Sequence, residues 1–138
     1  MTIVELMIVC VIIGIIISIS VPALVRNKMT ANEKATQRNL RAVGTAAEIY
    51  KTEQGVYPLD LLTLGSENPP MIDPVLSRGT QSGYQFEYAR NSNGSSFVTI
   101  ANPSGHGVTG IYSYCLDRDA RIKEYDNPLQ AGDGEVCP

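Results

Sequence analysis

The stretch MTIVELMIVCVIIGIIISISVPALV, residues 1–25, decides the fold of this chain. Its part from Leu6 to Val25 is uncharged and almost entirely apolar. As an α-helix this part would be roughly 30 Å long, which matches the hydrocarbon thickness of a bilayer. A cleavable secretory signal would have a shorter apolar core after a basic stretch. We therefore expect a transmembrane segment.

Glu5 is the one charged side chain that precedes this segment, directly at its N-terminal edge. A carboxylate deep in a membrane costs on the order of 3 kcal/mol, and less where it reaches the interface. Two interpretations are open. Glu5 is either a solvated acid at the level of the lipid headgroups or the partner of a positive charge. The nearest such charge is the α-amine of residue 1, which Glu5 could reach within its own chain or on a neighbouring chain.

Gly14 and Pro22 both weaken the helix, by about 1 and about 3 kcal/mol relative to alanine. The segment between them is a candidate for local melting. The alternative is a simple proline kink, which is common in membrane helices. The hydroxyls of Ser18 and Ser20 could satisfy backbone groups that Pro22 releases.

After Pro22 the pattern becomes amphipathic, with apolar or small residues at three- and four-residue steps. They are Val25, Met29, Thr36, Leu40, Val43, Ala47 and Tyr50. The periodicity predicts one helix from residue 2 to about residue 53, roughly 80 Å long, whose second half packs on the later part of the chain. Gly55 and Pro58 supply the stop, because glycine suits a left-handed cap and proline cannot continue a helix.

Residues 54–138 are predicted to form a small head of antiparallel strands. Residues 59–82 are rich in proline and glycine and are expected to form a connecting loop, with one helical turn at residues 59–64. Alternating residues from Tyr84, the Asn93-Gly94 turn and residues 97–101, 111–116 and 121–125 predict three or four strands.

The expected fold class is therefore α+β. A long N-terminal helix, hydrophobic in its first half and amphipathic in its second, packs on a small antiparallel sheet. We divide the chain into residues 1–25 for the membrane or filament-core half of the helix, 26–53 for the head-bound half and 54–138 for the head.

Length and charge limit the function further. The chain has 138 residues, a mass of 15.0 kDa and a formal net charge of -3, which suits one ordinary domain. Residues 54–138 contain five Lys or Arg and ten Asp or Glu. Such an acidic body argues against nucleic acid as the main partner, since phosphate binding relies on clustered cations.

Two of the three cysteines lie late in the chain, at Cys115 and Cys137. A disulfide between them would contribute roughly 3 kcal/mol in the chain-entropy model, and two free thiols are the alternative. A bridge requires an oxidising compartment and so places the head outside the cytoplasm. Arg26 and Lys28, just after the apolar segment, would by themselves favour the cytoplasmic side. Cys10 is expected to be a small, buried, apolar side chain.

Catalytic and metal-binding candidates are few. The single histidine, His106, lies in a glycine-rich loop without a paired nucleophile, and no phosphate-binding loop is present, so we expect no enzyme and no cofactor. Acidic residues near the C-terminus could bind calcium, but their spacing is not that of an EF-hand, so we expect a solvated acidic surface and no metal. They are Asp117, Asp119, Asp126, Asp133 and Glu135.

These features together resemble the mature type IV pilins and the related pseudopilins. The resemblance rests on the opening MTIVEL, Gly14, Pro22, the long helix, the GVYP exit at residues 55–58 and a C-terminal loop of disulfide size. The first 25 residues carry a highly specific motif, whereas the head matches in architecture alone.

The resemblance implies that the chain is processed and then assembled in successive steps. A prepilin peptidase in the inner membrane removes a basic leader, the new N-terminus is methylated, and an assembly machinery pulls subunits from the membrane into a helical homo-oligomeric filament. It assigns Glu5 to pairing with a neighbour's amine and the segment from Gly14 to Pro22 to unwinding on assembly. The family usually begins with Phe. Met1 is therefore either the processed N-terminus or a start residue.

Three alternative functions are compatible with these features, and we expect the first of them. The first is the major pilin of an extracellular type IV pilus on the cell surface, with roles such as adhesion or motility, and the loop between Cys115 and Cys137 favours it. The alternative is a pseudopilin of a type II secretion system, which calcium-dependent folding would favour. The third is a membrane-tethered binding domain that never assembles, and this interpretation leaves Glu5 without a role.

Overall fold

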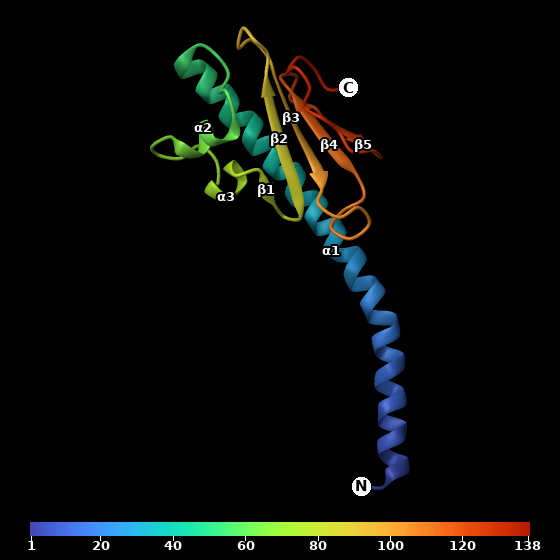
Figure 1. Ribbon diagram of the computed structural model, residues 1–138. Coiled ribbons are helices and arrows are strands. Elements are labelled where there is room, and N and C mark those ends of the chain that lie inside the picture. The colour runs from blue at the N-terminus through green and yellow to red at the C-terminus, as the bar shows by residue number, and fades with distance from the viewer.

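The computed structural model describes all residues from 1 to 138 as a helical stalk that carries a small head (Figure 1). Helix α1 runs without interruption from Ile3 to Gln54, a length of 52 residues. It begins at the N-cap Thr2 and ends at Gly55, whose φ of 82° is the left-handed conformation that glycine adopts most readily. The single long helix that the periodicity predicted is confirmed.

The head is a five-stranded antiparallel sheet with strand order β1-β2-β3-β4-β5. The strands are β1 (Thr80–Gln81), β2 (Tyr84–Arg90), β3 (Phe97–Pro103), β4 (Ser113–Asp117) and β5 (Ile122–Tyr125). Each strand pairs with the next along the chain, so the sheet is a simple meander. The second half of α1 lies along one face of this sheet (Figure 1).

The core forms where α1 meets the sheet and the connecting segment. Leu40 and Val43 on α1 are fully buried, together with Leu64, Tyr84 and Leu116 from the head. Gly44 brings the helix backbone close to the sheet, because a Cβ there would lie 2.6 Å from Cδ2 of Leu116. The apolar stripe of α1 is therefore core contact, as predicted, except that Val25 is 42% exposed and belongs to the stalk.

Two expectations about the head need correction. The sheet has five strands, not three or four, because the two residues of β1 pair with Tyr84 and Gln85 of β2. The stretch 59–82 also contains more structure than a loop with one turn. It holds α2 (Leu61–Ser66) and α3 (Pro74–Ser77), in addition to β1.

Local capping explains where these two short helices begin. Asp60 accepts a hydrogen bond from the backbone N–H of Thr63 at 2.8 Å, so α2 begins one residue later, at Leu61. Asp73 accepts from the N–H of Val75 at 2.7 Å, and the fixed φ of Pro74 suits the first helical position of α3.

Candidate assembly site

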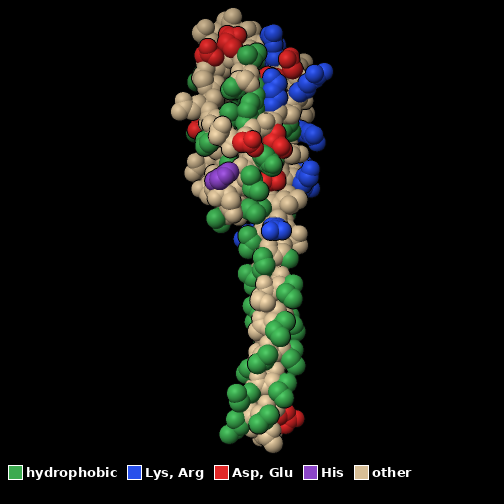
Figure 2. Space-filling view, turned by 90° about the vertical axis from the view of Figure 1, so that its right-hand side faces the viewer, with side chains coloured by type: hydrophobic (Ala, Val, Ile, Leu, Met, Phe, Trp, Pro, Cys, Tyr) green, Lys and Arg blue, Asp and Glu red, His purple; other side chains and the backbone are tan.

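The first half of α1 makes no packing contact with the rest of the chain. Its 18-residue window of highest hydropathy is 0% buried, and its length and composition are sufficient to cross a membrane. Every large apolar side chain from Ile3 to Val25 is at least 42% exposed. Figure 2 shows hydrophobic side chains along the whole length of this stalk, whereas most of the charged side chains lie on the head above it. A surface of this kind is stable only in lipid or against other apolar surfaces.

Glu5 lies in the first turn of this stalk, where it forms a capping box with Thr2. The backbone N–H of Glu5 donates to Oγ1 of Thr2 at 3.1 Å, and the backbone N–H of Thr2 donates to Oε2 of Glu5 at 3.4 Å. The two bonds satisfy N–H groups that a helix start leaves free. The recorded partner of the Glu5 carboxylate within the chain is thus a backbone amide, and Met1 is 97% exposed.

The capping box is a role for Thr2 that our sequence analysis missed. Its signal was readable, because a threonine followed three residues later by a glutamate, ahead of an apolar run, is the usual sequence of such a box. The box fixes the start of α1 and holds the carboxylate close to the helix N-terminus, where the helix dipole favours a negative charge.

The structure keeps the segment from Gly14 to Pro22 helical. Ser18 donates its hydroxyl to the carbonyl of Ile15 at 2.7 Å, and Ser20 donates to that of Ile16 at 2.8 Å. No side chain would crowd a Cβ at Gly14. The long axis of α1 bends between the stalk and the head-bound half (Figure 1), as expected of a helix that contains a proline. In this single chain the segment from Gly14 to Pro22 is therefore part of one continuous helix.

Two hydrogen bonds join the head to α1 at the point where the stalk ends. The loop between β3 and β4 lies at the end of the head nearest the stalk (Figure 1). Asn32 donates its side-chain amide to the carbonyl of Thr109 at 2.9 Å, and Oε1 of Glu33 accepts from the backbone N–H of Ile111 at 3.0 Å. The second bond explains why β4 begins at Ser113 and not at residue 111. Sequence periodicity carried no signal for these two contacts, which join residues 77 and 78 positions apart.

The opposite end of α1 is held by a cluster around Tyr57. The hydroxyl of Tyr57 donates to Oε1 of Glu48 at 2.6 Å, and Nη1 of Arg90 donates to the carbonyl of Tyr57 at 2.9 Å. The Lys51 ammonium lies 4.4 Å from the centre of the Tyr57 ring. Burial and the bond to Glu48 both raise the pKa of Tyr57 above its ordinary value, so it remains a neutral donor.

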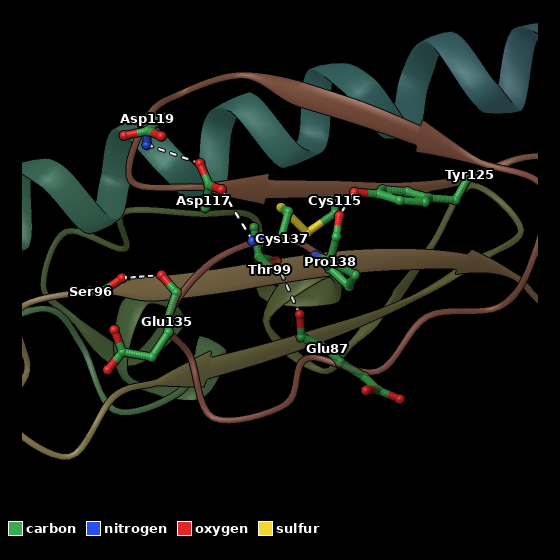
Figure 3. Close-up of a disulfide and its surroundings, with 10 residues drawn as sticks. All are labelled: Glu87, Ser96, Thr99, Cys115, Asp117, Asp119, Tyr125, Glu135, Cys137 and Pro138. Carbon is green, nitrogen blue, oxygen red and sulfur yellow. Dashed lines mark hydrogen bonds between the residues drawn. A yellow bond between two sulfur atoms is a disulfide. The ribbon is translucent and has the colours of Figure 1, made fainter.

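A disulfide joins Cys115 to Cys137 and ties the C-terminus to strand β4 (Figure 3). This pairing is the one that the sequence predicted, and Cys10 is free. The buried carboxylate of Asp117 accepts from the backbone N–H groups of Cys137 at 3.2 Å and Asp119 at 3.0 Å. Asp117 therefore positions the C-terminal loop, a role that the sequence did not reveal. Cys10, which we expected to be buried, is exposed on the stalk.

The remaining C-terminal acids are scattered or used in local bonds. Oε1 of Glu135 accepts from the side-chain amide of Asn91 at 3.2 Å, and Oδ1 of Asp133 accepts from the N–H of Glu135 at 3.4 Å. Across the chain, no three His, Cys, Asp or Glu side chains converge in a geometry suited to a metal ion. His106 lies exposed in the loop between β3 and β4.

An exposed apolar stalk continuous with the helix that packs on a small antiparallel sheet is the architecture of type IV pilin-like proteins. Comparisons with known proteins agree. The chain is 30% identical over 113 residues to the type II secretion system core protein G of Escherichia coli, covering 81% of this chain and 77% of that protein. It is 36% identical over 116 residues to the protein of the same name from Vibrio cholerae, covering 84% and 79%. The chain therefore belongs to the type IV pilin-like family, together with these core G proteins.

A solved structure of lower similarity has also been found. A type IV pilin from Shewanella oneidensis shares 19% identity with the chain at a TM-score of 0.46, covering 69% of this chain and 89% of that one. No family model matches the sequence. The names of the curated relatives favour the secretion-system alternative over the surface-pilus subunit that the sequence analysis placed first.

Proposed function

We propose that this chain is a pseudopilin subunit of a type II secretion system, anchored in the inner membrane by residues 1–25 and carrying its head in the periplasm. The observation that carries the proposal is the identity of 30 to 36% with core G proteins over more than three quarters of their length. The bare apolar stalk supports it, since a stalk of this kind needs lipid or like stalks around it.

In this proposal the chain works by assembly and not by catalysis. A prepilin peptidase exposes the N-terminus, and a membrane machinery then moves stalks from lipid into a homo-oligomeric helical bundle. Residues 1–25 become the core of the bundle, residues 26–53 support the head and residues 54–138 coat the outside. The disulfide supports a head that faces an oxidising compartment.

Two groups of residues have roles in this assembly. Glu5 pairs with the amine of residue 1 on a neighbouring chain, exchanging its bond to Thr2 for a charged partner. Gly14 and Pro22 bound the segment that extends when stalks pack, because both residues lower the stability of the helix there. A subunit of a surface pilus is the second candidate, favoured by the bridged C-terminal loop.

Replacement of the chromosomal gene with a null allele separates the two candidates. We expect loss of secreted proteins from the culture medium and their accumulation in the periplasm, while fibres sheared from the cell surface persist. Normal secretion with loss of the sheared fibres would overturn the secretion role and support the pilus subunit. Complementation with the unaltered gene is the control.

A further inference from the structure

Two exposed cations stand on the stalk between the apolar segment and the head. They are Arg26 and Lys28, which we call the basic pair. At 1.5 Å per residue they lie about 1.5 and 4.5 Å beyond Val25, the last apolar residue of the segment. The first hydrogen bond between the head and α1 is at Asn32, about 10 Å beyond Val25, and Met29, about 6 Å beyond Val25, is already partly buried. The headgroup layer of a bilayer is roughly 5 to 8 Å thick on each side, so the exposed helix between membrane and head, about 6 to 10 Å long, is comparable in length to that layer.

Neither cation has an anionic partner nearby on its own helix. The nearest acids in the sequence are Glu5 and Glu33. Glu5 is 21 residues before Arg26, or about 32 Å along the helix, at the opposite end of the apolar segment. The Glu33 carboxylate accepts from the N–H of Ile111 at 3.0 Å. It lies five residues from Lys28, on a different face of the helix, and seven residues from Arg26, about 10 Å along the axis.

The basic pair lies on the side of the membrane where cations next to a membrane segment are less common. Cations next to a membrane segment prefer the cytoplasmic side, yet the disulfide supports a head outside the cytoplasm, with the basic pair beside it. A compensating attraction is therefore needed. The phosphates of anionic lipids provide one, and a cation near such a surface gains about 1 kcal/mol, or roughly fivefold in affinity.

The loop between β3 and β4 adds an apolar contact at the same end of the head. Residues 104–112 are tied to α1 at Asn32 and Glu33, and they present Val108 and Ile111 with 66% and 42% of their surfaces exposed. A loop that exposes two apolar side chains at the end of the head nearest the two cations suits the membrane interface, where both the phosphates and the first acyl carbons are within reach.

We propose that the basic pair binds the phosphates of anionic phospholipids in the leaflet that faces the head, and so holds the unassembled subunit at a fixed depth. The proposal rests on the membrane-anchored form described above. Arg26 and Lys28 contact the headgroups, and the loop at residues 104–112 rests on the surface. The occupant of this part of the helix is lipid before assembly and not a second copy of the chain.

Energy transfer from a single tryptophan tests the lipid contact. The chain has no tryptophan, and the exposed Val108 offers a site for Val108→Trp. The full-length variant is reconstituted at a low protein-to-lipid ratio in vesicles that contain pyrene-labelled phosphatidylglycerol or pyrene-labelled phosphatidylcholine. We expect several-fold stronger transfer to the anionic lipid at low salt, which declines as salt screens the charges.

Two matched double variants locate the effect. In the Val108→Trp background, Arg26→Gln with Lys28→Gln should abolish the preference for phosphatidylglycerol. Lys34→Gln with Arg38→Gln removes the same charge from exposed positions beside the head, about 14 and 20 Å beyond Val25, and should keep most of the preference. Near-ultraviolet circular dichroism confirms that each head is folded.

The outcomes separate this proposal from the one on which it rests. Equal transfer to both lipids, with Cys10 protected from a membrane-impermeant thiol reagent, would overturn the lipid contact alone. A preference that survives loss of the basic pair, or that both double variants lose equally, would overturn it as well. Transfer that responds to the basic pair only at high protein density would assign the pair to a second copy instead. A reactive Cys10 would overturn the membrane-anchored form and this proposal together.

Discussion

The two halves of α1 are one continuous helix, but they have opposite surroundings. Residues 3–25 lie bare and apolar, whereas the second half buries Leu40 and Val43 completely against the sheet. The head shares its core with this half of α1, contains the disulfide and forms hydrogen bonds near both ends of that half. The interactions that stabilise the folded chain therefore lie in the head and the helix half that it covers. The stalk, in contrast, needs lipid or other stalks around it. A change to one half should accordingly leave the other half unaffected.

The largest effect should come from Glu5, which we expect to matter for assembly and not for folding. Glu5→Ala should abolish secretion in a null strain while leaving membrane-inserted protein and an unchanged melting temperature of the head. Glu5→Gln separates charge from capping, because glutamine keeps a capping acceptor but has no charge. We expect it to fail in assembly as well.

A matched control uses the acid at the other end of the same helix. Glu53→Ala removes an exposed carboxylate from the last turn of α1 and should secrete normally. Normal secretion by Glu5→Gln would show that the capping bond matters and the charge does not. Secretion is measured as the fraction of an exported protein found in the medium.

The disulfide should show the second largest effect, confined to the head. Replacing Cys115 and Cys137 with serine should lower the free energy of unfolding by about 3 kcal/mol, because the unfolded chain regains the entropy of a 22-residue loop. Cys10→Ser on the stalk should change nothing. Thermal unfolding of the full chain in detergent, followed by the near-ultraviolet dichroism of tyrosine, measures both.

Tyrosine is a selective probe, since all seven tyrosines lie at residue 50 or later. A double serine variant as stable as the unaltered chain would mean that the hydrogen bonds of Asp117 and Ser96 hold the C-terminal loop without the bridge.

High pH should destabilise the head and leave the stalk helical. Burial raises the pKa of Tyr84 and Tyr88 above the ordinary value and that of Tyr114 to about 12. The unfolded chain therefore releases these protons first, and stability is complete below the ordinary tyrosine pKa and falls as the pH rises toward 12. The melting temperature at pH 11 should be lower than at pH 9 by on the order of 5 °C.

Absorbance at 295 nm reports phenolate directly. If the absorbance rises by more than three of the seven phenolates before the dichroism falls, buried tyrosines ionise in the folded head, and that result would contradict the prediction. Far-ultraviolet dichroism at 222 nm should keep a helical remainder after the head has melted, because lipid or detergent supports the stalk.

The smallest effect should come from two hydroxyls on β2. The buried hydroxyl of Tyr88 has no hydrogen-bond partner, whereas that of Tyr84 donates to the carbonyl of Tyr112 at 2.9 Å. Tyr88→Phe should therefore be neutral or stabilising by up to about 1 kcal/mol, and Tyr84→Phe destabilising by about 1 kcal/mol. Thermal unfolding of the two variants side by side checks the sign. Equal destabilisation by both would indicate that Tyr88 has a partner in solution.

The same contrast explains what could be predicted from the sequence. The stalk and the long helix depend on composition and periodicity, which are local properties, so both were predictable to within a few residues. The disulfide was predictable from two cysteines in the water-exposed part of the chain. The assignment of function went less far, because the opening motif is common to pilins and pseudopilins. The comparisons with curated relatives, over 81% to 84% of the chain, favour the second.

The missing parts depended on contacts between distant residues or on weak local signals. Strand β1 has two residues and exists only through its pairing with Tyr84 and Gln85. The hydrogen bonds of Asn32 and Glu33 with the loop at residues 104–112 join segments that are far apart in the chain. The capping residues Thr2, Asp60 and Asp73 were different, because their short-range patterns stood in the sequence and could have been used.

The uninterrupted course of α1 has a mechanical consequence. No flexible linker separates the stalk from the head, and the head is fastened to the helix at both ends of the contact, at Asn32 and near Tyr57. The head therefore cannot rotate independently of the part of α1 that it covers. A rotation imposed on α1 beyond Pro22 therefore turns the outer surface of the subunit through the same angle.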